Sequence, residues 1–230
     1  MSLLFALVLA ALPAPFDNLV DTVLWDHKVF TRPGALKPLK DCNPRNTPCH
    51  LVELDAKGPT VCVGFDEGPS DDPTFVLLPR AACGKPLGTM EPLLEIGATT
   101  LIIPGNGFVY ATGHTNNYFD ARRKFELSGG KLREVKQPFY AVGGGPRRVQ
   151  RTPLMDEDDP VQPIILRSER RDDAPVVATV PAGGEVEVLL SDGPDTGWFL
   201  VRTAFGLVGW YHSPSGGTMP DTLGIYFHGD

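Results

Sequence analysis

Four cysteines are the first residues whose type and spacing imply specific chemistry. Cys42, Cys49, Cys62 and Cys83 all lie in one stretch of the amino-terminal half. Their spacing lacks the short Cys-x2–4-Cys pairs of structural zinc sites, so we expect disulfides and no bound metal. Four thiols allow three pairings. The two prolines in CNPRNTPC bend the loop between the first two cysteines, which favours Cys42–Cys49 and Cys62–Cys83.

The histidines and acids form no recognisable catalytic motif. The five histidines, at positions 27, 50, 114, 212 and 228, lack a metal-ligand spacing such as His-Glu-x-x-His. The chain also lacks a Gly-x-Ser-x-Gly motif, a phosphate loop and a dinucleotide-binding fingerprint. We therefore favour a non-enzymatic protein without a cofactor. The alternative is a hydrolase with catalysis in residues 16–142, whose cleft would gather His114 with Asp120 or a free cysteine.

Residues 1–14 are typical of an export signal. The segment MSLLFALVLAALPA is apolar, has no charged side chain and ends in small residues. It is shorter than the ~20 apolar residues that cross a bilayer, and no later apolar run is longer. We therefore expect a secreted or periplasmic protein rather than an integral membrane protein. The alternative is an apolar segment that packs on the first domain.

Composition and patterning favour a turn-rich β protein. The chain contains 25 glycines and 23 prolines, and offers no long helical stretch free of both. Strand-length apolar runs occur within 52–65, 74–80 and 99–113, separated by turn residues. Residues 122–140 alternate on both sides of Gly129 and Gly130, which predicts a β-hairpin. Residues 18–30 fit either one helix or a pair of strands.

Charge is distributed unevenly along the chain. The net charge of −7 excludes a generally basic nucleic-acid binder but allows a local basic surface. Residues 121–151 contain nine bases and two acids, a net charge of +7, whereas residues 152–230 have a net charge of −9. We favour attraction between these segments within the monomer over a site for an anionic ligand.

The composition changes after residue 142. Residues 143–160 are rich in glycine, proline and blocks of charge, which predicts a linker after an N-terminal β domain at 16–142. Residues 161–213 return to short apolar runs separated by turns, and a tail follows at 214–230. Five or six strands in about fifty residues bury their apolar faces by closing into a small barrel.

Within 161–213, glycines, tryptophans and apolar residues follow one another in a specific order. The residues that define this order are Leu166, Arg167, Val177, Pro181, Gly183, Trp198, Val201, Gly206, Gly209 and Trp210. The segment resembles the bacterial SH3-like (SH3b) domain. It departs from the usual Leu-Asn-Val-Arg of the first strand, with Ile-Ile-Leu-Arg at 164–167. The resemblance implies a small SH3-like β-barrel that binds peptidoglycan or peptides outside the cytoplasm.

Four aromatic residues are the candidate binding residues of this module: Trp198, Phe205, Trp210 and Tyr211. A flat apolar ring with an N–H or O–H group suits an extended peptide or a sugar. The spacing of Trp198, and even more that of Trp210, also suits the barrel core. We expect Phe205 and Tyr211 at the exposed surface.

The sequence thus predicts a mainly β protein, with a disulfide-bearing N-terminal β domain followed by an SH3-like barrel. Its expected function is that of an exported binding protein of the bacterial cell envelope. The expected partner is peptidoglycan or an envelope protein or peptide, and not nucleic acid. Besides the envelope hydrolase, an inhibitor of an external hydrolase remains as an alternative, supported only by the acidic charge balance.

Overall fold

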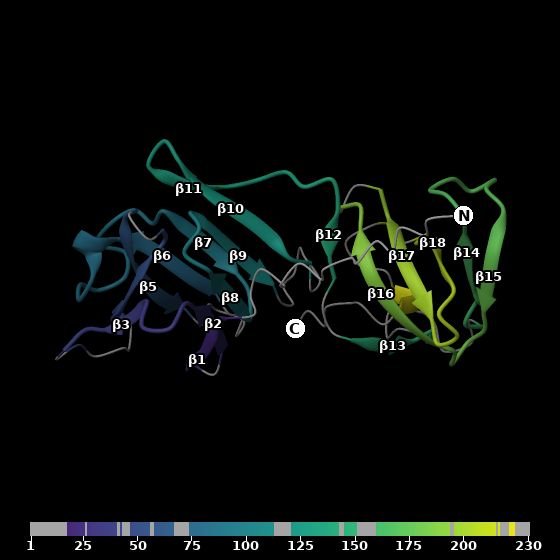
Figure 1. Cartoon of the computed structure of the whole chain (residues 1–230), viewed down its shortest axis with the longest axis horizontal. Helices are drawn as coiled ribbons and strands as arrows, with labels where there is room; N and C mark the ends of the chain where they lie inside the picture. The colour runs from purple at the N-terminus through teal and green to yellow at the C-terminus, as the bar shows by residue number, and fades with distance from the viewer. Residues whose placement is uncertain are drawn as a thin grey trace, which may run out of the picture.

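The chain is built from β-strands. The computed structural model describes residues 18–25, 27–40, 42, 47–55, 58–66, 74–112, 121–142, 145–150, 160–193, 196–214, 216 and 221–223. These residues form three sheets and two short 3-10 helices, which confirms the expected mainly β fold class (Figure 1). The expected export signal lies outside the described residues. Within them, no helix has the length and apolar character needed to span a membrane.

A six-stranded sheet is formed by segments from both ends of the N-terminal region. Its order is β1 (Val20–Leu24), β2 (His27–Thr31), β8 (Thr100–Ile103), β9 (Phe108–Thr112), β10 (Arg123–Ser128) and β11 (Lys131–Glu134). Only β2 and β8 pair in parallel. Of the two possibilities for residues 18–30, the structure has the strand pair. The hairpin expected at Gly129 and Gly130 is confirmed, and both glycines have the positive φ (59° and 77°) that its tight turn requires.

A five-stranded antiparallel sheet is formed by the residues between β2 and β8. Its strands, in sheet order, are β3 (Leu36–Pro38), β4 (His50–Glu53), β5 (Thr60–Asp66), β6 (Thr74–Pro79) and β7 (Leu94–Gly97), and the helix η1 (Arg80–Ala82) follows β6. Alternate residues of both sheets face one shared core, which includes Val29, Leu101, Val63, Phe75 and Leu77, all fully buried. The N-terminal region is therefore a β-sandwich.

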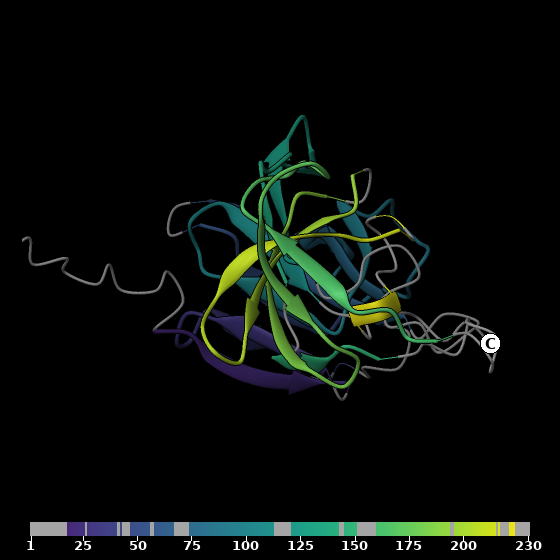
Figure 2. The ribbon, with the colours of Figure 1, turned by 90° about the vertical axis from the view of Figure 1, so that its right-hand side faces the viewer.

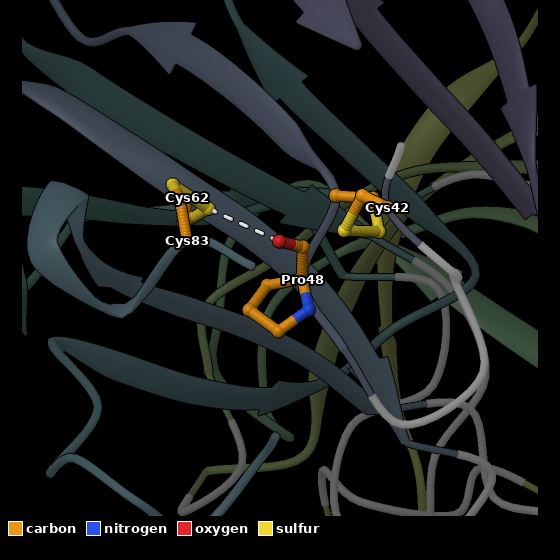
Figure 3. The surroundings of a disulfide bond; sticks show 5 residues. Cys42, Pro48, Cys62 and Cys83 are labelled. Atoms are coloured by element: carbon orange, nitrogen blue, oxygen red, sulfur yellow. Dashed lines mark hydrogen bonds between the residues drawn. A yellow bond between two sulfur atoms is a disulfide. The ribbon is translucent and has the colours of Figure 1, made fainter. Parts of the chain in front are cut away.

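Both favoured disulfides, Cys42–Cys49 and Cys62–Cys83, are present in the structure. Cys62 lies on the face of β5 that points away from the sandwich core and is completely buried beside Leu78 and Ala82. Its sulfur also lies 3.5 Å from the carbonyl oxygen of Pro48 (Figure 3). The Cys62–Cys83 bond thus fastens the segment after η1 over the outside of the five-stranded sheet.

The C-terminal sheet has seven strands. They are β12 (Tyr140–Ala141), β13 (Pro146–Arg148), β14 (Ile164–Arg167), β15 (Val176–Val180), β16 (Glu185–Ser191), β17 (Trp198–Thr203) and β18 (Val208–His212). The order is β12-β16-β17-β18-β14-β15, and β13 also pairs with β16. The sheet curls around a core that includes Ile164, Leu166, Phe199 and Val201 (Figure 2). The short helix η2 (Asp221–Leu223) adds Leu223 to this core.

Part of the expected linker belongs to this sheet. The strand β13 pairs with β16, and the fully buried Val149 is a member of the C-terminal core. The strand β12 also pairs with β16, although the sequence assigned it to the N-terminal domain. On its other side, Ala141 accepts a hydrogen bond of 2.8 Å from the backbone N–H of Arg122. We therefore propose that the C-terminal module begins at β12 and not at residue 161.

Candidate functional site: the β14–β18 cleft

A cleft of about 310 Å³ opens beside β14 and the end of β18. The apolar residues that line it are Val161, Pro163, Ile165 and Pro214. Ile165 is 40% exposed because its neighbours in β14, Ile164 and Leu166, point into the core. The polar groups at the cleft include Arg167, Asp172 and His212. We call this site the β14–β18 cleft.

The alternation of β18 decides which of its side chains reach this surface. Gly209 and Tyr211 point inward, whereas Trp210 and His212 point outward. Gly209 is required where β18 crosses β14. A Cβ at this position would lie 2.9 Å from the Leu166 Cβ and 3.0 Å from the Arg167 carbonyl oxygen. The close crossing brings the end of β18 next to the outward side chains of β14.

The imidazole of His212 is held between a carboxylate and an indole. Its Nδ1 lies 3.0 Å from Asp172 Oδ1, and its ring stacks on Trp198 with centroids 4.4 Å apart and planes 6° apart. The Asp172 side chain remains 72% exposed. Trp198 therefore fixes the orientation of His212, while the Asp172 carboxylate remains accessible to a ligand.

The loop at 168–175 uses most of its charges internally. Arg171 pairs with Glu169 and Asp173, and Arg170 pairs with Asp192, which follows β16. Arg167 donates a hydrogen bond of 2.8 Å to the Ala174 carbonyl oxygen, which ties the loop to β14. The loop is thus anchored at both ends, and Asp172 is its acidic residue at the cleft.

One of the candidate binding residues, Tyr211, lines the cleft, and a second, Trp198, stacks on its lining residue His212. The Tyr211 side chain is only 6% exposed and belongs to the C-terminal core. The expectation that Tyr211 is exposed was wrong, because the inward register of β18 falls on this residue. Trp198 is 9% exposed, so it is buried as expected. The stacked His212 ring covers the Trp198 indole, which is not a member of the core cluster.

The other two candidates lie elsewhere. Trp210 points outward, so the expectation that it packs in the core was wrong. Its ring centroid lies 5.8 Å from that of Phe139 and 5.3 Å from the Arg170 guanidinium carbon. Phe205, at the turn between β17 and β18, is 95% exposed, as expected. Ile165, Asp172 and His212 were not predicted as site residues from the sequence. No sequence signal pointed to His212, because the inward register expected for Trp210 would also have placed residue 212 in the core.

The N-terminal region supplies no thiol for the hydrolase alternative, because all four cysteines are in disulfides. His114 and Asp120 lie outside the described residues. Within the described part of the chain, no group of three or more His, Cys, Asp or Glu residues could hold a metal ion. The half-buried His50 contacts Trp25 edge-on, with ring centroids 5.9 Å apart. Burial lowers the pKa of the His50 imidazole below its ordinary value.

This lowered pKa makes the stability of the β-sandwich depend on pH. The unfolded chain binds a proton at His50 more readily than the folded chain. Stability is therefore complete above the ordinary pKa of about 6.5 and decreases as the pH falls through and below that value. We expect the melting temperature to decrease between pH 7.5 and pH 5, and the decrease to be smaller in His50→Gln. An equal decrease in both proteins would contradict the assignment to His50.

Residues 163–215 match the family model of the bacterial SH3 domain. The resemblance found in the sequence is therefore confirmed for the C-terminal part, which contains a bacterial SH3 domain. Such a domain indicates a cell-wall or peptide-binding module, and together with the two disulfides it fits an extracellular or envelope protein. No curated protein and no solved structure matches the chain.

Proposed function

We propose that this chain is an exported, non-enzymatic binding protein of the bacterial cell envelope. Its SH3 domain binds a peptide, such as the peptide part of peptidoglycan, in the β14–β18 cleft. The observation that carries this proposal is the combination of apolar lining residues, including Ile165, with the exposed carboxylate of Asp172 in one cleft. The two disulfides support a location outside the cytoplasm.

The chemistry of the cleft suits a short segment of peptide. Ile165 and the flanking prolines cover an aliphatic side chain, and each Å² of apolar surface removed from water contributes about 25 cal/mol. Asp172 accepts charge-assisted hydrogen bonds from an ammonium group, which is stronger than a neutral hydrogen bond. The guanidinium of Arg167, on the same cleft, is suited to a carboxylate or a carbonyl group of the ligand.

We expect Asp172→Asn to weaken binding to purified peptidoglycan about tenfold, because a hydrogen bond to a charged group contributes about 1.5–3 kcal/mol. Ile165→Ala should weaken binding to a similar extent through lost apolar contact. Both side chains are exposed, so the thermal unfolding of both variants should remain close to that of the parent chain. Co-sedimentation with purified peptidoglycan over a range of protein concentrations measures the affinity.

Phe205→Ala is the matched control, because Phe205 is 95% exposed and does not line the cleft. Its binding should equal that of the parent chain. Loss of binding in Phe205→Ala with normal binding in Asp172→Asn and Ile165→Ala would move the site to the β17–β18 turn. Unchanged binding in all three folded variants would contradict a binding role for both surfaces.

A further inference from the structure

The outer face of the six-stranded sheet carries a row of side chains that the SH3 domain does not use. In the strand register, Phe30 lies opposite Ile102, Ile102 opposite Tyr110, and Tyr110 opposite Lys124. These residues come from β2, β8, β9 and β10, which are neighbours in the sheet (Figure 1). The alternate residues of the same strands face the sandwich core, so the row lies on the outside.

A second row adds another aromatic ring and another base. Phe108 lies next to the first row, with its ring 6.4 Å from that of Tyr110, and the Lys124 ammonium lies 3.7 Å from the Phe108 ring centroid. Phe108 pairs with Glu126, which in turn pairs with Arg133. We call this surface the basic-aromatic face. Its aromatic and basic members are Lys28, Phe30, Phe108, Tyr110, Lys124 and Arg133, and Glu126 and Asp21 lie on the same face.

The three bases of this face outnumber its two acids, Asp21 and Glu126. Lys28, Lys124 and Arg133 form no ion pair with an acid among the described residues. By contrast, Arg123 pairs with Glu134, and Lys131 pairs with Glu91 and lowers the pKa of that carboxyl. Two of the bases at 121–151 are thus paired with acids of the sandwich, whereas Lys124 and Arg133 lie together on the basic-aromatic face.

Part-exposed rings beside unpaired cations are complementary to an acidic polysaccharide. The C–H faces of sugar rings pack on aromatic rings, and uronate carboxylates pair with lysine and arginine. Adjacent strands lie about 4.8 Å apart, so the row from Phe30 to Lys124 spans roughly 14 Å, the size of a short oligosaccharide segment. A nucleic acid is less favoured, because the net charge of the chain is −7 and the disulfides indicate an oxidising compartment.

We propose that the basic-aromatic face binds an acidic polysaccharide that carries carboxylates. The full chain should bind polygalacturonate in isothermal titration calorimetry at low salt, and added salt should weaken this binding. Neutral dextran should bind at least tenfold more weakly. Single-stranded poly(dT) that binds more tightly than polygalacturonate would overturn the proposal in favour of a nucleic acid, and absence of polygalacturonate binding at low salt would overturn it entirely.

Two charge-matched variants locate the site. Lys124→Gln with Arg133→Gln should weaken polygalacturonate binding at least tenfold. Lys37→Gln with Arg202→Gln removes the same charge from positions that pair with Glu53 and Glu187, and should change binding less than twofold. Equal weakening by both pairs would overturn the proposal, since attraction would then depend only on net charge. Phe108→Ala should weaken binding severalfold without changing the charge, and normal binding would contradict the role of the rings.

Discussion

Gly209→Val should unfold the SH3 domain or reduce its stability by about 3 kcal/mol or more. A Cβ at residue 209 would lie 2.9 Å from the Leu166 Cβ and 3.0 Å from the Arg167 carbonyl oxygen, so the two strands would have to separate. Overpacking a core costs roughly 1–3 kcal/mol, and here one of the colliding atoms belongs to the backbone, which does not rotate away. A loss of this size is a large fraction of the stability of a small domain.

The control is Val208→Ile, which adds one carbon to the preceding residue of β18. Val208 points outward and is 44% exposed, so the added methyl group reaches solvent. Thermal unfolding followed by tryptophan fluorescence measures both variants, because Trp198 and Trp210 lie in the affected sheet. A melting temperature for Gly209→Val equal to that of Val208→Ile would show that β14 and β18 do not approach closely.

Removing the Cys62–Cys83 disulfide by the double substitution Cys62→Ala and Cys83→Ala should destabilise the β-sandwich by about 3 kcal/mol. The bond closes a loop with a sequence separation of 21, which restricts the unfolded chain. In the folded chain, Cys62 is fully buried against Leu78 and Ala82, so the substitution also removes packed atoms. Urea denaturation of the oxidised protein gives the free energy of unfolding.

The matched comparison is the double substitution Cys42→Ala and Cys49→Ala. This bond closes a loop with a sequence separation of only 7, so its loss should cost about 1 kcal/mol less. The transition of the SH3 domain should not change in either variant. If the second pair proved the more destabilising, loop closure would not explain the role of the Cys62–Cys83 bond.

The features predicted correctly from the sequence have local causes. Two glycines between alternating strands specify the hairpin of β10 and β11. A short loop with two prolines favours the pairing of Cys42 with Cys49, which leaves Cys62 for Cys83. The SH3 domain was recognised because glycines, tryptophans and apolar residues follow one another within one short segment. Each of these signals lies within one continuous segment of the chain, so it can be recognised without knowing which distant strands pair.

The features that were missed depend on distant pairing or on strand register. The parallel pairing of β2 with β8 joins Val29 to Leu101, and no local pattern specifies that contact. The cleft joins Asp172 to His212 in the same way. A shift of one residue exchanges the two faces of a strand, which explains why Trp210 and Tyr211 were assigned to each other's environments.

The strand β12 has a mechanical consequence. It is hydrogen-bonded on one side to Arg122, which precedes β10, and on the other side to β16. The preceding Phe139 packs against Trp210 and Arg170. The carboxylate of Asp192, only 5% exposed, holds the Arg170 guanidinium in place. If the SH3 domain is bound to a rigid cell wall, a force that pulls on the sandwich acts on the hydrogen bonds of β12 and on the contacts of Phe139 and Arg170 at the same time. A flexible linker would instead extend before it transmitted the force. The sandwich would then keep a fixed orientation relative to the surface to which the SH3 domain is bound.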